Sequence, residues 1–427
     1  MKAKIIPIIS TFSFLAFLFV SCEDSNYKEY KGNAPVYMTY EELRESVGLK
    51  ESTELENPGK IYFKDSYIFI IEELKGIHVF DNSVPSAPVK KAFVKIPGVA
   101  DMVISGSTLY ADSFVDLVII DVQDINNIHE TGRMIDILPY IVPPTGNDYP
   151  MGNIDREKGL VVDWEVKTIK EKIYDNPIVY PVFMTGTQRM DGAFYNASSS
   201  GVSGSGVGVG GSMARFGIKE NILYLLNNNN IEVIDISVKS TPSSLYKVNA
   251  GWGIETMFLT ENNMFLGTTT GMIIFDITEP ENIVRKSTYN HMRSCDPVVV
   301  DDTLAYITLR SGTNCGGTLN CLDVVNIKNL MSPVLIRSYP LTNPFGLGKD
   351  GDLLFVCDGN AGLKVYDASN PFMISSRLIY TYPNIKAYDV IPVNGVLVMI
   401  GDDGLFQYSY TDLNNISLLS KIEVTKP

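Results

Sequence analysis

The chain has 427 residues, of which 45% are hydrophobic and 20% are charged, so most of it is expected to fold around a core. Its formal net charge of −14 argues against nucleic acid and anionic lipid headgroups as ligands. The 23 tyrosines, 19 phenylalanines and 34 glycines favour strands and tight turns.

The first residues predict an export signal. Two lysines precede an apolar run, Ile5–Val20, which ends at Cys22 before acidic residues. The run is too short for a membrane-spanning helix, so residues 1–21 are expected to be a cleaved signal peptide. Leu18–Cys22 resembles a lipobox, which implies a lipid on Cys22 and an outer-membrane location, on the cell-surface or the periplasmic face. An ordinary secretory peptide is the alternative.

The segment after the signal is polar and then becomes locally helical. We expect residues 22–34 to be a solvated tether. The pair Glu23-Asp24 resembles the surface-export signal of Bacteroidetes lipoproteins. Residues 35–59 are expected to form an N-terminal segment with one short helix within Thr39–Lys50.

The rest of the chain repeats a short apolar strand that ends in a polar residue, usually Asp. The copies end at Asp81, Asp121, Asp235, Asp276, Asn326, Asp367 and Ser409. Five of the six spacings lie between 40 and 50 residues, which is the length of a four-stranded propeller blade. Such units bury their faces only by stacking, and equally apolar terminal units favour a closed ring. The sequence therefore predicts an all-β propeller of about seven blades over residues 60–427.

The repeated strand also carries a family resemblance. Leu117–Asp121 resembles the LVIVD repeat of bacterial lipoproteins, many of them from Bacteroidetes. Further similar segments are the strands ending at Asp235, Asp276 and Asp367, and residues 210–216 and 309–317. The resemblance runs from about Lys60 to the C-terminus. It implies a β-propeller fold and a lipid-anchored location, and it implies no reaction.

Residues 139–212 are expected to be an insertion between the second and third blades. They contain a strand-like stretch, Leu160–Val166, and a run rich in glycine and serine, Ser198–Ser212. No lysine follows these glycines and no βαβ unit surrounds them, which argues against a phosphate loop or a dinucleotide site. We interpret the run as a linker. The alternative is that its backbone lines the mouth of the axial tunnel, close to a ligand.

Four cysteines remain after Cys22. Cys295 and Cys315 are expected on one face of the fifth unit, so we predict a disulfide between them, worth about 3 kcal/mol for a loop of about 20 residues. Cys321 is the rival partner of Cys315. We expect Cys357 to be a buried free thiol.

The catalytic residues of zinc or Ser-His-Asp enzymes are not recognisable. No HExxH motif or nucleophile elbow occurs, and the three histidines lie in three different units. We predict no cofactor, although acids around the tunnel mouth could hold calcium. The candidate ligand contacts lie near the starts of first strands: Trp252, His291, Arg293 and Tyr388.

These features favour binding over catalysis. The first hypothesis is a monomeric binding or scaffold module for a protein or glycan partner at the outer membrane, touching the membrane through its lipid anchor. The alternative is a polysaccharide lyase or hydrolase that uses carboxylates and a metal at the tunnel mouth. Asp296 and Asp389 are its candidate acids, and a pocket joining them to His291 or Arg293 would favour it.

Overall fold

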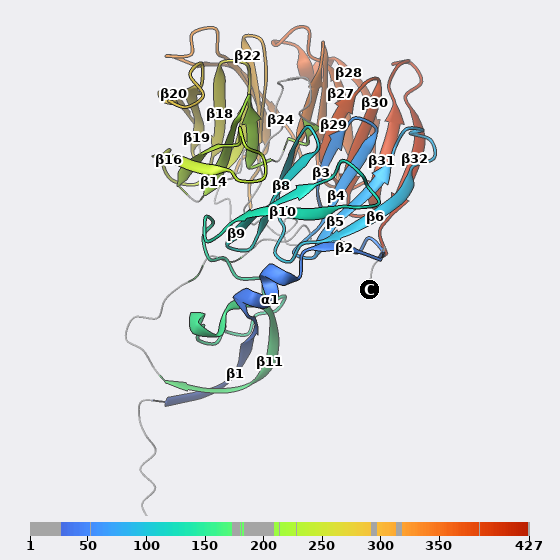
Figure 1. Ribbon diagram of the computed structural model, residues 1–427. Coiled ribbons are helices and arrows are strands. Elements are labelled where there is room, and N and C mark those ends of the chain that lie inside the picture. Colours follow the sequence, from blue (N-terminus) through green and yellow to red (C-terminus); the bar gives the residue numbers. More distant parts are fainter. Residues whose placement is uncertain are drawn as a thin grey trace, which may run out of the picture.

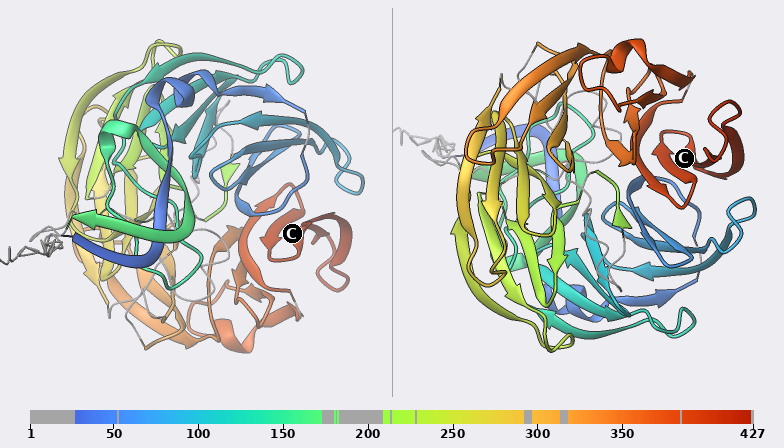
Figure 2. Two further views of the ribbon diagram at one scale, coloured as in Figure 1. Left: turned by 90° about the horizontal axis from the view of Figure 1, so that it is seen from below. Right: turned by 90° about the horizontal axis from the view of Figure 1, so that it is seen from above.

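The computed structural model describes residues 27–51, 53–172, 180, 182, 209–212, 214–227, 229–291, 297–312, 318–383 and 385–425. The strands form seven antiparallel blades around one axis (Figures 1 and 2), so the predicted seven-bladed all-β propeller is confirmed. No helix within these ranges is long and apolar enough to cross a membrane.

Each blade contains four consecutive strands, the first nearest the axis. Blade 1 contains β3 (Pro58–Lys64), β4 (Tyr67–Glu72), β5 (Gly76–Asp81) and β6 (Val89–Lys95), and blade 2 contains β7 (Met102–Ser105), β8 (Thr108–Ser113), β9 (Asp116–Asp121) and β10 (His129–Met134). Blade 3 contains β13 (Phe216–Lys219), β14 (Ile222–Asn227), β15 (Asn230–Asp235) and β16 (Ser243–Asn249), and blade 4 contains β17 (Ile254–Leu259), β18 (Asn263–Thr268), β19 (Gly271–Asp276) and β20 (Val284–Asn290). Blade 5 contains β21 (Val298–Asp301), β22 (Leu304–Leu309), β23 (Cys321–Asn326) and β24 (Val334–Pro340). Blade 6 contains β25 (Leu347–Asp350), β26 (Leu353–Cys357), β27 (Leu363–Asp367) and β28 (Leu378–Tyr382), and blade 7 contains β29 (Ala387–Val393), β30 (Val396–Gly401), β31 (Gly404–Ser409) and β32 (Ser417–Glu423).

The polar residue that ends each copy of the repeat caps a turn. In six blades its side-chain oxygen accepts a hydrogen bond from the backbone N–H two residues later, at 2.8–3.0 Å. Such Asx turns suit Asp and Asn because the short side chain reaches its own backbone. The capping residues are Asp81, Asp121, Asp235, Asp276, Asn326 and Asp367. The repeat is therefore a turn signal as well as a strand signal.

Apolar side chains between neighbouring blades form the core. Ile104 and Val118 of blade 2 belong to one cluster with Ile71 of blade 1 and Leu223 of blade 3. Blade 7 meets blade 1 through a reciprocal pair of buried amides. Here Asn82 donates to Gln407 at 2.8 Å and Gln407 donates back at 2.7 Å. The ring is closed by the same kinds of contact that hold its interior together.

The N-terminal segment forms its own small structure against the ring. Thr39 and Glu42 make a capping box that starts α1 (Tyr40–Glu45). The helix lies within the predicted range Thr39–Lys50, and the end of that range, Gly48–Lys50, forms β2 and pairs with β6 at the edge of blade 1. Pairing of this kind covers an otherwise open strand edge.

The predicted tether of residues 22–34 is wrong from Tyr27 onward. Residues Tyr27–Met38 form β1, which pairs along its whole length with β11 (Leu160–Lys172) of the insertion. The Tyr30 hydroxyl donates to Glu171 at 2.5 Å, and Lys28 lies 3.3 Å from the same carboxylate. The strand predicted at Leu160–Val166 is confirmed and is longer than expected, because its partner comes from a distant part of the sequence. We call this pair of strands the ribbon.

α1 lies at one end of the propeller, and the ribbon extends from that end away from the ring (Figure 1). Arg44 of α1 contacts Asp116, at the start of β9, at 3.0 Å. First and third strands run in the same direction, so every blade begins its first strand at this end. We call this end the insert face, and the end with the Asx turns the opposite face. Seen from below, the ribbon crosses one side of the ring (Figure 2).

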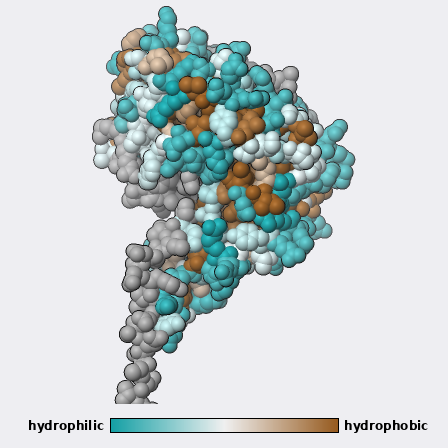
Figure 3. Space-filling view, turned by 60° about the vertical axis from the view of Figure 1, so that its left-hand side comes forward, coloured by the Kyte–Doolittle hydropathy of each residue, from teal (hydrophilic) through white to brown (hydrophobic). Residues whose placement is uncertain are grey.

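The side of the propeller carries exposed apolar residues on its outermost strands. Val284 of β20 and Val334 and Leu335 of β24 are all exposed. Figure 3 shows hydrophobic side chains gathered over the side of the propeller, among hydrophilic ones. Scattered apolar residues are normal on a folded surface, so these strands alone define no site.

Candidate functional site

The segment that follows the insertion closes the axis at the insert face. β12 (Val209–Gly210) pairs with β3 inside the ring, and we call residues 209–212 and 214–215 the plug. The backbone N–H and the hydroxyl of Ser212 donate to Asp389 Oδ1 at 2.9 and 2.8 Å. The Leu347 N–H donates to the same hydroxyl at 2.7 Å. The plug thus ties blades 1, 6 and 7 together.

The end of the glycine run makes this closure possible. A Cβ on Gly211 would lie 1.7 Å from Asp389 Oδ2, so no other residue fits there without displacing the carboxylate. Backbone at Gly210–Gly211 therefore lines the axis, as the tunnel-mouth interpretation proposed for the run. The atoms it approaches belong to the protein itself. Residues 198–208 of the run lie outside the described residues.

Buried charges surround the plug. Lys60 Nζ lies 2.5 Å from Asp101, which also accepts a hydrogen bond from the Arg215 backbone N–H. Asp112 accepts from the N–H groups of Ala100 and Asp101 at 2.6 and 2.8 Å. Burial raises the pKa of Asp112 to about 6. These groups satisfy one another, so they organise the axis rather than face a ligand.

The axis is open from the opposite face. A cavity of about 230 Å³ is lined by the ends of first strands and by Val209 and Gly210 of the plug. An ion pair between Lys349 and Asp301, at 2.6 Å, lies at its wall. Among the described residues, the plug therefore forms part of the wall of this axial cavity.

The predicted ligand contacts lie in different surroundings. Trp252 is 80% exposed on the insert face, between Gly251 (φ 118°) and Gly253 (φ 67°). His291 is half-buried, with its ring centroid 6.0 Å from that of Tyr289. Tyr388 is buried and packs edge-on against Phe345. Trp252 is the candidate that presents its whole side chain to a partner.

Other predicted site residues fall outside the described ranges. These are Cys22, Arg293, Cys295, Asp296 and Cys315. The lipid attachment and the Cys295–Cys315 disulfide therefore stay predictions.

The two described cysteines are both buried. Cys357 is a free thiol, as predicted, and burial raises its pKa. The thiol of Cys321 lies 3.7 Å from Asp323 Oδ1. Within the described residues, no group of three or more His, Cys, Asp or Glu could hold a metal ion.

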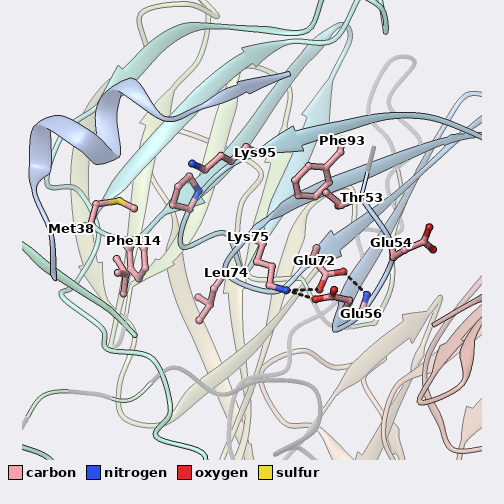
Figure 4. Close-up of a pocket in the computed structure, with 12 residues that line it drawn as sticks. Met38, Thr53, Glu54, Glu56, Glu72, Leu74, Lys75, Phe93, Lys95 and Phe114 are labelled. Carbon is pink, nitrogen blue, oxygen red and sulfur yellow. Dashed lines mark hydrogen bonds and ion pairs between the residues drawn. The ribbon is translucent and has the colours of Figure 1, made fainter. Parts of the chain in front are cut away.

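The sequence did not reveal a cavity of about 390 Å³ between the N-terminal segment and blades 1 and 2 (Figure 4). Its size falls within the range of small-molecule sites, and such sites often lie where two parts of a fold meet. The lining combines apolar and charged side chains. It consists of Met38, Thr53, Glu54, Glu56, Glu72, Leu74, Lys75, Phe93, Lys95, Pro97, Phe114 and Val162.

Two bulky apolar residues in this lining have strained backbones. Leu74 (φ 61°) and Phe114 (φ 53°) occupy matching turns between the second and third strands of blades 1 and 2. The matching turn of blade 6 uses Gly359 and Gly362 at positive φ instead. Positive φ is rare for large side chains, and such strain clusters at binding sites. Leu74 and Phe114, in turns where blade 6 has glycine, are the sequence signal that could have revealed this cavity.

Hydrogen bonds to Glu72 keep one wall of the cavity in place. Its carboxylate accepts from the backbone N–H groups of Glu56 and Asn57 at 3.0 and 2.8 Å and lies 3.3 Å from His78 Nε2. Burial raises the pKa of Glu72, but these hydrogen bonds outweigh it and hold the pKa below its usual value. His78 is completely buried.

A substitution at Leu74 tests whether the backbone at this residue is strained. Asn tolerates positive φ, so we expect Leu74→Asn to leave the free energy of unfolding unchanged or to raise it by about 1 kcal/mol. Leu74→Ala keeps the strain and loses apolar contacts, so it should lower that free energy by about 1 kcal/mol. Urea denaturation of both variants measures this. If the Leu74→Asn variant were less stable than the Leu74→Ala variant, the claim that the backbone of Leu74 is strained would be contradicted.

The comparisons with known proteins show the fold. The chain is similar to the computationally designed protein Ika8, with 8% identity, a TM-score of 0.50 and 93% of each chain covered. It is also similar to a protein from Lactobacillus plantarum, with 11% identity and a TM-score of 0.50, covering 87% of this chain and 97% of that one. BamB from Moraxella catarrhalis is a more distant match, with 9% identity, a TM-score of 0.46, and 84% of this chain and 83% of that one covered. No protein-family model and no curated protein matches the sequence. The chain is thus a seven-bladed propeller without a family assignment, and the LVIVD resemblance stays a prediction.

Proposed function

We propose that the chain is a lipid-anchored binding module of the outer membrane, and that its insert face engages a membrane or surface protein. The plug closes the axis on this face, so a partner would contact the loops and the cavity around it. Asp389, the described acid of the alternative enzyme hypothesis, is fully buried and holds Ser212. A binding role would use the accessible surface of the insert face. A propeller fold does not by itself determine a reaction.

The position of the ribbon carries this proposal. β1 begins at Tyr27, five residues after Cys22, and the ribbon extends from the insert face away from the ring (Figure 1). Five residues span at most about 18 Å. A lipidated Cys22 would therefore keep the outer end of the ribbon near the membrane, and the insert face would be directed toward that membrane. Several acyl chains together make such an anchor stable.

Trp252 favours a protein over a glycan as the partner. Buried tryptophans dominate the binding energy of many protein interfaces, and here an indole is 80% exposed in the free molecule. The adjacent glycines allow the positive φ angles of the turn that presents it.

A photo-reactive amino acid placed at position 252 tests this function in intact cells. We expect covalent adducts with one outer-membrane protein from position 252 and none from position 372. Phe372 is the matched control because it is 58% exposed on the opposite face. The Cys22→Ser variant should abolish the adduct by releasing the chain from the membrane. Equal adducts from both positions, or an adduct that persists without Cys22, would contradict the proposal.

A further inference from the structure

We infer that the cavity between the N-terminal segment and blades 1 and 2 binds a single-chain amphiphile with an anionic head group, such as a long-chain carboxylate. This site lies apart from Trp252, so the inference goes beyond the proposed partner binding. It rests on the shape of the lining, on the strain in two of its residues and on one charge that lacks a partner.

The apolar lining offers a surface that the protein itself leaves uncovered. Met38, Leu74, Phe114 and Val162 are all half-buried and line the same cavity, with buried Phe93 beside them. They come from β1, the two strained turns and β11, so the ribbon and the propeller each supply one wall. Phe114 packs in part against a small cluster that includes Leu43 and Val115, and both Phe114 and Leu74 stay half-buried at the cavity. An apolar chain bound between them would bury the part of these side chains that the protein leaves accessible.

The acidic side chains of the lining are already engaged. Glu72 accepts two backbone hydrogen bonds and one contact from His78, as described above. Glu56 pairs with Lys75 at 2.5 Å. The Glu54 carboxylate is directed away from the other lining residues in Figure 4 and lies 3.5 Å from the Thr425 hydroxyl. A cationic head group would therefore find no unmatched acid inside the cavity.

Lys95 is the lining charge that remains unmatched. Within the described part of the chain, its ammonium group makes neither a hydrogen bond nor an ion pair. It lies on the side of Met38 and Phe114, away from the acidic group around Glu56 (Figure 4). A half-buried ammonium group at one end of an apolar cavity complements a carboxylate on an apolar chain. Charge-assisted hydrogen bonds of this kind are stronger than neutral ones.

Calorimetric titration of the full chain carrying Cys22→Ser tests the inference, because this chain has no acyl group of its own. The probes are laurate, lauryl alcohol and dodecyltrimethylammonium, which share one chain length and differ in charge. We expect laurate to bind about tenfold more tightly than the alcohol, and the cation to bind more weakly than either. Laurate binding no tighter than alcohol binding would overturn the inference, and this comparison needs no further variant.

Two variants locate the site. Lys95→Met should weaken laurate binding about tenfold and leave lauryl alcohol binding unchanged, whereas Leu74→Asn should weaken both. Lys91→Met is the matched control, because Lys91 lies on the same strand and does not line the cavity. Laurate affinity unaffected by Lys95→Met would overturn the assignment of the head group. Cross-linking from position 252 does not depend on these results, so this inference and the proposed function can fail separately.

Discussion

Asp389→Ala is expected to lower the free energy of unfolding by about 3 kcal/mol. The substitution leaves the N–H and the hydroxyl of Ser212 and the N–H of Val390 without their acceptor in a buried place. Each unsatisfied buried donor costs about 1 to 3 kcal/mol, and water that enters the space offsets part of this. Ser212→Ala should cost less, about 1 kcal/mol, because the backbone N–H keeps its partner.

Denaturation in urea measures these losses, and limited proteolysis shows where they act. Opening of the plug should produce early cleavage near Gly211 in the Asp389→Ala variant. Asp148→Ala is the matched control, since Asp148 is exposed and belongs to the insertion. If Asp389→Ala and Asp148→Ala are equally stable, the plug does not hold the blades together.

Asp112→Asn is expected to stabilise the protein above about pH 6. Burial raises the pKa of Asp112 from 3.8 to about 6, so the folded state favours the protonated, neutral form. The protein therefore loses stability as the pH rises from about 4 to about 6, and the loss persists above that range. A shift of this size corresponds to about 3 kcal/mol. The Asn oxygen can still accept from Ala100 and Asp101, so the variant keeps both hydrogen bonds without the charge.

The test compares the two proteins at two pH values. The stability gain of Asp112→Asn at about pH 8 should exceed its gain at about pH 4 by about 2 kcal/mol, because at pH 4 the folded state is protonated and the unfolded state is about half protonated. The comparison of two pH values cancels any local effect of the amide. An equal gain at both values would show that Asp112 titrates normally and that the buried charges around the axis are solvated.

The propeller could be predicted from sequence because its signals are local and repeated. In six blades the Asp or Asn that ends the third strand caps its own turn, and the strand before it is mostly apolar. Both features depend on residues only a few positions apart. Seven copies of the strand, with five of the six spacings between 40 and 50 residues, leave few alternatives to a ring.

The ribbon, the plug and the cavity depend on distant partners, and the sequence did not predict them. β1 has the composition of a tether, and its strand exists because β11 supplies the hydrogen bonds. Gly211 looks like part of a linker until Asp389, far along the chain, lies against it. The cavity left one local sign, the apolar Leu74 and Phe114 in turns that match the glycine-containing turn of blade 6.

These contacts between distant parts of the sequence build the insert face. The plug uses the end of the insertion to close the axis, and the ribbon uses another part of the same insertion to build the wall of the cavity. The insertion therefore helps to build the face that carries Trp252 and from which the ribbon extends. The opposite face keeps the regular turns of the repeat and the shallow axial cavity.

The orientation of the propeller on a membrane tests the central proposal most directly. The lipidated protein would be reconstituted in vesicles that contain a fluorescent acceptor lipid, with a donor dye attached at position 252 or at position 372. The proposal predicts stronger energy transfer from position 252, because the insert face is directed toward the bilayer. Equal transfer from both positions, or stronger transfer from position 372, would contradict it.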